Sequence, residues 1–142
     1  LKINNNLERI GDYADSIARF VQRCPLREED KELFKKLRLE EMSTQVLSMF
    51  AQTHESLSEQ NIGLAKSVFE EDELLDQLNR EAVDILADYA TEHPESMKLC
   101  LELAGVFRKM ERAGDHISNL AEETVFYIDA EVLKHTRSME RN

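Results

Sequence analysis

The sequence predicts an all-α protein, built as an antiparallel three-helix bundle preceded by one further helix. Leu, Glu, Ala, Lys, Arg and Met dominate the composition, and all six are good helix formers. Only four glycines and two prolines interrupt 142 residues, so the backbone has few places to turn. Apolar residues recur at three- and four-residue steps along most of the chain, which is the spacing of a helix with one buried face.

The first predicted helix occupies residues 1–24. Its apolar stripe consists of Leu7, Ile10, Ala14, Ile17, Ala18 and Val21. The Cys24-Pro25 pair ends the helix, because the residue before a proline is driven out of the α region. The helical pattern is already under way at Leu1, which predicts that further residues precede it in the parent protein. We expect the stripe to pack on the rest of the chain or on a second copy of it.

Three long helices are predicted within residues 28–135, followed by a tail at 136–142. The first runs from about Glu28 to Ser58. The second runs from about Ile62 to Thr91, with Asn61 as its N-cap. The third has Pro94 in its first turn and runs to about Leu133. Helices of about 30 residues are about 45 Å long, and short connections between them predict an antiparallel bundle.

The charge balance narrows the possible partners. The chain carries 29 acidic and 18 basic residues, a formal net charge of −11. A chain this acidic is repelled by nucleic acid and by anionic lipid headgroups, and no apolar stretch approaches the length of a membrane span. Cys24 and Cys100 are isolated, which indicates free thiols in a reducing, cytoplasmic setting.

One segment of the sequence occurs twice. Residues 7–18 and 110–121 share the pattern Glu-Arg-x-Gly-Asp, and the flanking apolar residues also agree in position and type. The two copies lie 103 residues apart, which suits a duplicated three-helix unit rather than a short solenoid repeat. We call them the first copy and the second copy of the motif.

The paired segments, Glu-Arg-Ile-Gly-Asp-Tyr-Ala-Asp-Ser-Ile-Ala and Glu-Arg-Ala-Gly-Asp-His-Ile-Ser-Asn-Leu-Ala-Glu, resemble the signatures of the PhoU family. That resemblance implies two three-helix bundles, with one signature on the third helix of each. Residues 1–24 then correspond to the C-terminal part of the third helix of the first PhoU repeat, and residues 28–135 to the complete second repeat.

Pairs of carboxylates spaced four residues apart are the candidate functional groups. Each copy of the motif supplies one such pair, Glu8 with Asp12 and Glu111 with Asp115, and each pair shares one helical face. The pairs lie away from the apolar stripes, so they are expected at the surface. A third pair, formed by residues 72 and 76, is about as far from the turn near Pro94 as Glu111 is. We therefore expect Asp72, Asp76, Glu111 and Asp115 to converge between the second and third long helices.

Converging carboxylates favour hard or borderline cations such as iron, zinc, manganese or magnesium. The resemblance implies metal clusters at such acidic pairs, so the four acids are the expected metal ligands, with His116 and Asn119 as accessory residues. Glu8 and Asp12 are half of an incomplete first site, because their partner acids belong to helices outside this chain. Glycine costs about 1 kcal/mol relative to alanine within a helix. Gly11 and Gly114 therefore predict a close helix approach or room for a ligand.

The resemblance also implies a function. PhoU proteins are non-enzymatic negative regulators of the phosphate-starvation response, acting between the ATPase subunit of a phosphate ABC transporter and a phosphate-sensing histidine kinase. A homodimer is expected. One alternative is the PhoU-like cytosolic domain of a sodium–phosphate cotransporter. A di-metal carboxylate enzyme is the other, but such bundles use Glu-x-x-His pairs that point into the core. The sequence contains no Glu-x-x-His, so no enzyme is predicted.

Overall fold

The computed structural model describes residues 2–24 and 27–139, with side chains as far as Lys134. Within that part every element is helical. The elements are α1 (Lys2–Arg23), η1 (Glu28–Asp30), α2 (Lys31–Lys36), α3 (Leu39–Glu59), α4 (Ile62–Glu92), η2 (Pro94–Ser96) and α5 (Met97–Met139). The predicted all-α class is confirmed. None of the helices in the described ranges is apolar over a stretch long enough to cross a bilayer.

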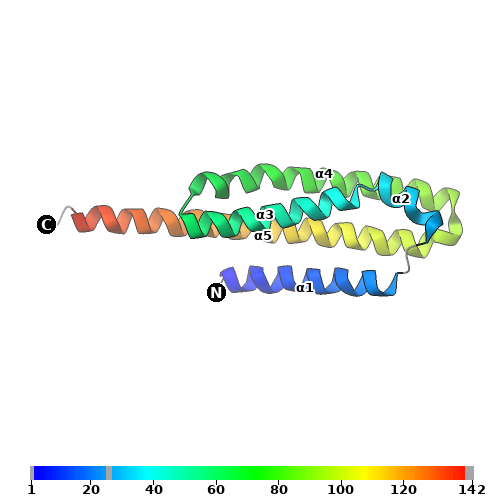
Figure 1. Ribbon diagram of the computed structural model, residues 1–142, viewed down its shortest axis with the longest axis horizontal. Coiled ribbons are helices and arrows are strands. Elements are labelled where there is room, and N and C mark those ends of the chain that lie inside the picture. Colours follow the sequence, from blue (N-terminus) through cyan, green and yellow to red (C-terminus); the bar gives the residue numbers. More distant parts are fainter. Residues whose placement is uncertain (1, 25–26, 140–142) are drawn as a thin grey trace.

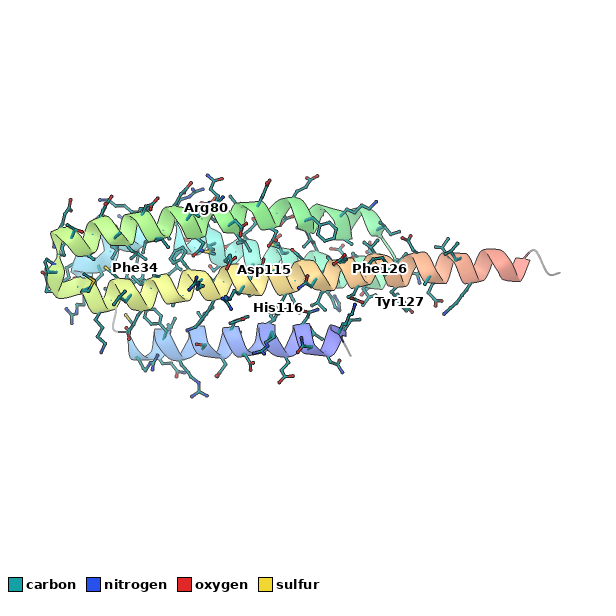
Figure 2. The ribbon with its side chains drawn as sticks, turned by 180° about the vertical axis from the view of Figure 1, so that it is seen from behind. Phe34, Arg80, Asp115, His116, Phe126 and Tyr127 are labelled. Atoms are coloured by element: carbon teal, nitrogen blue, oxygen red, sulfur yellow. The ribbon has the colours of Figure 1, made fainter. Side chains whose placement is uncertain are left out.

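Helix α5 is the centre of the molecule, since it contacts α1, α3 and α4. Figure 1 shows α3, α4 and α5 as an antiparallel bundle, with α1 running antiparallel to α5 on the side away from α4. Helices α4, α5 and α1 thus form one layer, and α3 covers one side of it (Figures 1 and 2). The C-terminal part of α5 extends beyond the bundle, and Phe126 and Tyr127 are exposed close to the point where it leaves α4. The predicted packing of the first helix on the rest of the chain is confirmed.

The core lies between α3, α4 and α5 and beneath α2. Its largest fully buried hydrophobic side chains are Leu33, Leu37, Met42, Met49, Val68, Leu75, Leu78, Leu103, Phe107 and Ile117. Along each long helix they recur three, four, seven or ten residues apart, so one face of the helix is covered by its neighbours. Full burial of such a side chain contributes about 1.5–3 kcal/mol, which makes this stripe the main source of stability for the bundle.

One predicted helix is wrong. The stretch from Glu28 to Ser58 is not continuous but breaks at Arg38, whose φ of 55° lies in the left-handed region. Its guanidinium donates to Glu41 at 2.7 Å and to Glu81 of α4 at 2.9 Å. The break lets α2 fold over the end of the bundle, where Leu33 and Leu37 are buried. A left-handed residue costs about 1–2 kcal/mol, and burial of two leucines offsets that cost.

The other helix ends agree more closely with the sequence. Asn61 caps α4, because its Oδ1 accepts the backbone N–H of Leu64 at 3.2 Å, so this prediction is confirmed. Pro94 opens the short turn η2 that leads into α5. Helix α5 runs on to Met139 rather than ending near Leu133, so it takes in the first four residues of the predicted tail.

The predicted buried face of α1 is only partly right. Ile10 and Ile17 are half-buried, but Leu7, Ala14 and Val21 are exposed. The face that meets α5 carries Asn6, Ile10, Tyr13, Ile17, Phe20 and Cys24, spaced alternately three and four residues apart. Helix α1 therefore has two adjacent apolar stripes, of which α5 covers one. The sequence predicts burial of the exposed stripe because that stripe contains more apolar residues, whereas the stripe that packs on α5 includes the polar residues Asn6 and Tyr13.

Candidate functional site

The second copy of the motif lies at a close contact between α4 and α5. A Cβ atom placed on Gly114 would be 2.3 Å from Cδ1 of Leu75 and 3.1 Å from Oδ1 of Asp72. Only glycine fits at this point without displacing a buried leucine or the carboxylate. The close helix approach predicted from Gly114 is confirmed, and it brings a carboxylate of α4 against the motif on α5.

Three of the four predicted acids have raised pKa values. Burial is the main cause for Asp72, and the negative charges of Asp115 and Asp76 add to it, while nearby Ser118 opposes the shift. Burial also raises the pKa of Glu111, followed by repulsion from Asp115 and Asp76. The pKa of Asp115 rises through burial and then through Asp76. Charges on α4 and α5 therefore act on one another across the helix contact, while the convergence of the four carboxylates on one site stays a prediction.

The chemistry of these side chains suits a hard cation, whose positive charge would relieve their mutual repulsion. Their arrangement is looser than a complete coordination shell. Within the described ranges, no three His, Cys, Asp or Glu side chains lie so that they hold one metal ion together. The role of Asp72, Asp76, Glu111 and Asp115 as metal ligands therefore stays a prediction.

A polar hollow of about 310 Å³ adjoins the acids. It is lined by Tyr13 of α1, Asn79 of α4, and Arg108, Glu111, Arg112, Asp115 and His116 of α5. It lies on the face of the α4–α5–α1 layer turned away from α3, where Figure 2 shows Asp115 on the α4 side of α5 and His116 on the α1 side. We call it the polar hollow. All three helices of the layer contribute to it.

His116 connects the polar hollow to α1. Its Nδ1 lies 2.8 Å from Oδ1 of Asn6, and its ring centre is 5.9 Å from that of Tyr13. Asn6 is only 8% exposed, so this hydrogen bond fixes the ring orientation in a largely buried setting. The position of Tyr13 in the first copy matches that of His116 in the second. The repeat identified the two residues as counterparts but gave no sign that they touch.

The accessory residue Asn119 lies elsewhere. It lines a second hollow of about 480 Å³, together with Lys66, Phe69, Ser118, Glu122, Val125 and Phe126. Two residues of the polar hollow, and Asn6 behind His116, escaped notice in the sequence. Arg108 and Asn79 lie outside any motif, and Asn6 is a polar residue next to an apolar stripe. Only the packing of α1 and α4 against α5 reveals them.

The first copy of the motif has different surroundings. Glu8 and Asp12 are exposed. A Cβ atom on Gly11 would meet no atom of the described chain within 4 Å. The acids expected to complete the site of Glu8 and Asp12 belong to helices outside this chain. In the described ranges, no second helix packs on Gly11 as α4 packs on Gly114. Metal binding by Glu8 and Asp12 remains an untested expectation.

Comparisons with known proteins give the family. The PhoU domain family model matches residues 39–124, which covers α3, α4 and most of α5. A Thermotoga maritima protein named as a phosphate-specific transport system accessory protein PhoU homolog is 31% identical over 127 residues, covering 89% of this chain and 53% of its own length. Relatives with matching names occur in Aquifex aeolicus, 34% identical over 140 residues with 99% and 62% coverage, and in Pseudomonas aeruginosa, 29% identical over 131 residues with 92% and 53% coverage.

The chain thus spans about half the length of these curated relatives. The family match itself extends over more than half of the chain and includes both acidic pairs of α4 and α5. Together with the doubled Glu-Arg-x-Gly-Asp motif and the helical bundle that carries it, this match identifies the chain as a member of the PhoU family.

Proposed function

We propose that the chain is a non-enzymatic regulator of phosphate uptake and signalling. It would restrain the phosphate-starvation response by acting between the ATPase subunit of a phosphate ABC transporter and a phosphate-sensing histidine kinase, in the cytoplasm and as a homodimer. The match to the PhoU domain carries the proposal. It is supported by relatives named as accessory proteins of phosphate-specific transport systems.

The shape of the molecule suits docking. The α4–α5–α1 layer leaves one face uncovered by α3, and α5 adds exposed aromatic surface at Phe126 and Tyr127. Long helices present such surfaces rigidly, which lowers the entropy lost when a partner binds.

Docking is tested by measuring binding of the purified chain to the isolated ATPase subunit and to the cytosolic part of the kinase, for example by interferometry. We expect saturable binding to at least one of them. Substitution of Phe126 and Tyr127 by Ser should weaken it, whereas substitution of exposed Val83 on α4 by Ser serves as the control. If neither partner binds the unaltered chain, the regulatory role proposed here is wrong.

We further propose that Asp72, Asp76, Glu111 and Asp115 bind iron, zinc, manganese or magnesium ions, with His116 as an accessory ligand. A bound cation would neutralise acids that now raise one another's pKa. Small side-chain rotations would be needed to close the shell, because the described side chains do not yet surround one point.

The metal site is tested by elemental analysis of the protein as purified, beside an Asp76→Ala, Glu111→Ala variant. An Asp84→Ala, Asp129→Ala variant is the matched control, because it removes two exposed acids from the same two helices. We expect the first variant to lose bound metal and the control to retain it. Equal metal content in all three proteins would eliminate this site.

A further inference from the structure

Two guanidinium groups line the polar hollow. The charge of Arg112 lowers the pKa of Glu111 and of Asp115 without a direct ion pair to either. Arg108 is three residues before Glu111, and Arg112 is three before Asp115, a spacing at which ion pairs usually form on a helix. Neither arginine makes a hydrogen bond or a direct ion pair with another residue in the ranges that the structure describes. Their donors therefore remain available at the wall of the hollow.

The same wall also presents acceptors. Glu111 and Asp115 contribute carboxylates, and Oδ1 of Asn79 is buried without a hydrogen-bond partner among the described residues. Buried acceptors without partners are uncommon, because each forfeits the hydrogen bonds that water would supply. A ligand suited to this wall must accept hydrogen bonds from arginine and donate one to a carboxylate or an amide oxygen.

Inorganic phosphate meets both demands. Near neutral pH it carries negative charge on oxygens that arginine binds well, and it still carries a proton that it can donate. Sulfate has the same shape and charge but no proton at that pH. A hollow of about 310 Å³ holds a tetrahedral anion with several water molecules.

We infer that the polar hollow is a binding site for protonated inorganic phosphate. Arg108 and Arg112 donate to its charged oxygens, and Glu111 or Asp115 accepts the hydrogen of its hydroxyl group. Such a site would let a regulator of phosphate uptake bind phosphate directly. Its role in regulation rests on the proposed function, whereas phosphate binding itself does not. Tyr13 of α1 closes one side of the hollow, so the shape of the site depends on the packing of α1 on α5.

The acidic character of the chain does not exclude this site. Exposed charges more than about 10 Å apart are largely screened at an ionic strength of 0.1 M, so groups at the hollow dominate. The lining of the hollow carries two guanidinium groups and the two carboxylates of Glu111 and Asp115. Asp72 and Asp76 beside it add negative charge, so phosphate binding depends on direct hydrogen bonds from the arginines. Asn6 fixes the ring of His116 beside them, so this part of the wall is already ordered before the ligand arrives.

The test is isothermal titration calorimetry with phosphate on chelator-treated protein, at neutral pH and constant ionic strength. Arg108→Gln and Arg112→Gln should each weaken binding at least about tenfold, as expected for a lost charged hydrogen bond. Arg80→Gln is the control, because Arg80 is exposed on the outer side of α4, away from the hollow (Figure 2). All three side chains are exposed, so the variants should fold alike.

The proton is tested by replacing phosphate with sulfate, which should bind at least about tenfold more weakly because the carboxylates then lack a donor. In the Glu111→Gln variant the amide can donate a hydrogen bond to sulfate, so the difference in affinity between phosphate and sulfate should become smaller. A titration with phosphoserine distinguishes free phosphate from a phosphorylated side chain, and we expect free phosphate to bind more tightly.

Four results would overturn the inference: no binding to the unaltered chain, equal losses in Arg80→Gln and Arg112→Gln, equal affinity for sulfate, or tighter binding of phosphoserine. Binding that occurs only after metal is added would also overturn it, because the site is defined without a metal. None of these results decides whether the chain binds a transporter ATPase or a kinase, which is measured separately. Conversely, failure to bind those partners leaves the phosphate titration unaffected.

Discussion

The two copies of the Glu-Arg-x-Gly-Asp motif lie on neighbouring helices of one molecule, yet they meet different surroundings. In the second copy, on α5, Met110 is 8% exposed and Gly114 lies against Leu75 and Asp72 of α4. In the first copy, on α1, the counterpart Leu7 is 43% exposed. A Cβ atom placed on Gly11 would meet no atom of the described chain within 4 Å. The same short sequence is therefore part of a packed helix contact in one place and of an open helix face in the other.

This difference shows that the motif by itself does not fix the environment of its residues. In the second copy, burial and the further carboxylates of α4 raise the pKa values of Glu111 and Asp115. The glycine of the motif is constrained only where a second helix comes close. What the motif does provide in both copies is a helix that carries acids on one side and small or apolar residues on the other.

The largest expected contrast concerns the apolar residue that precedes each motif. Met110→Ala should lower the free energy of unfolding by about 2–4 kcal/mol, because it leaves a cavity in the core. Leu7→Ala should change it by no more than about 0.5 kcal/mol. Urea denaturation followed by circular dichroism measures both. If Leu7→Ala proves as costly, a second copy of the chain covers this face in solution, and stability would then depend on protein concentration.

Replacing each of the two glycines by alanine should change the stability of the folded chain in opposite directions. Gly114→Ala forces a Cβ atom onto buried Leu75, and overpacking costs about 1–3 kcal/mol, against a helix-propensity gain of about 1 kcal/mol. Gly11→Ala gains that propensity with no clash, so it should stabilise the chain by up to about 1 kcal/mol. Thermal unfolding of the two variants under identical conditions provides the comparison. A stabilising Gly114→Ala would mean that α4 and α5 lie further apart than described.

The smallest contrast is electrostatic and depends on pH. The folded state raises the pKa of Asp115, so it binds this proton more tightly than the unfolded state does. Stability should therefore fall as pH rises from about 4, the ordinary range of carboxyl groups, through the raised pKa. Asp115→Asn should flatten this decline and stabilise the neutral-pH protein by a few tenths of a kcal/mol.

Asp12→Asn is the matched control, because it removes the equivalent acid from the exposed first copy. The measurement is the free energy of unfolding at several pH values from 4 to about 8, in low salt. If both variants change the slope equally, the effect comes from net charge and not from the acids between α4 and α5.

The sequence was sufficient for the features that depend on local spacing. The helical class, the Asn61 cap and the shared level of the acidic pairs on α4 and α5 all follow from periodicity, capping chemistry and helix length. Gly114 marked a close helix approach because glycine is costly within a helix unless the space is needed. All of these features depend on residues within one helix or across one short turn.

Features that depend on the choice between competing contacts could not be predicted. A single left-handed residue at Arg38 breaks an otherwise helical pattern, and its compensation comes from burial of Leu33 and Leu37 and from Glu81 on another helix. The face of α1 that meets α5 includes the polar residue Asn6. Its burial is explained by the hydrogen bond with His116, which only the folded structure reveals. The polar hollow draws on three helices, so no single stretch of sequence indicates it.

The antiparallel contact between α1 and α5 has one more consequence. Asn6 meets His116, and Lys2 pairs with Glu123 at 3.4 Å, so the numbers of facing residues add up to 122 and to 125. Because the motif copies are 103 residues apart, the level at which a residue faces its own counterpart falls within the motif, between Arg9 and Gly11. The two copies of the motif therefore lie side by side and run in opposite directions across the contact between α1 and α5. Any movement of α1 along α5 would change which residues of the two copies face each other.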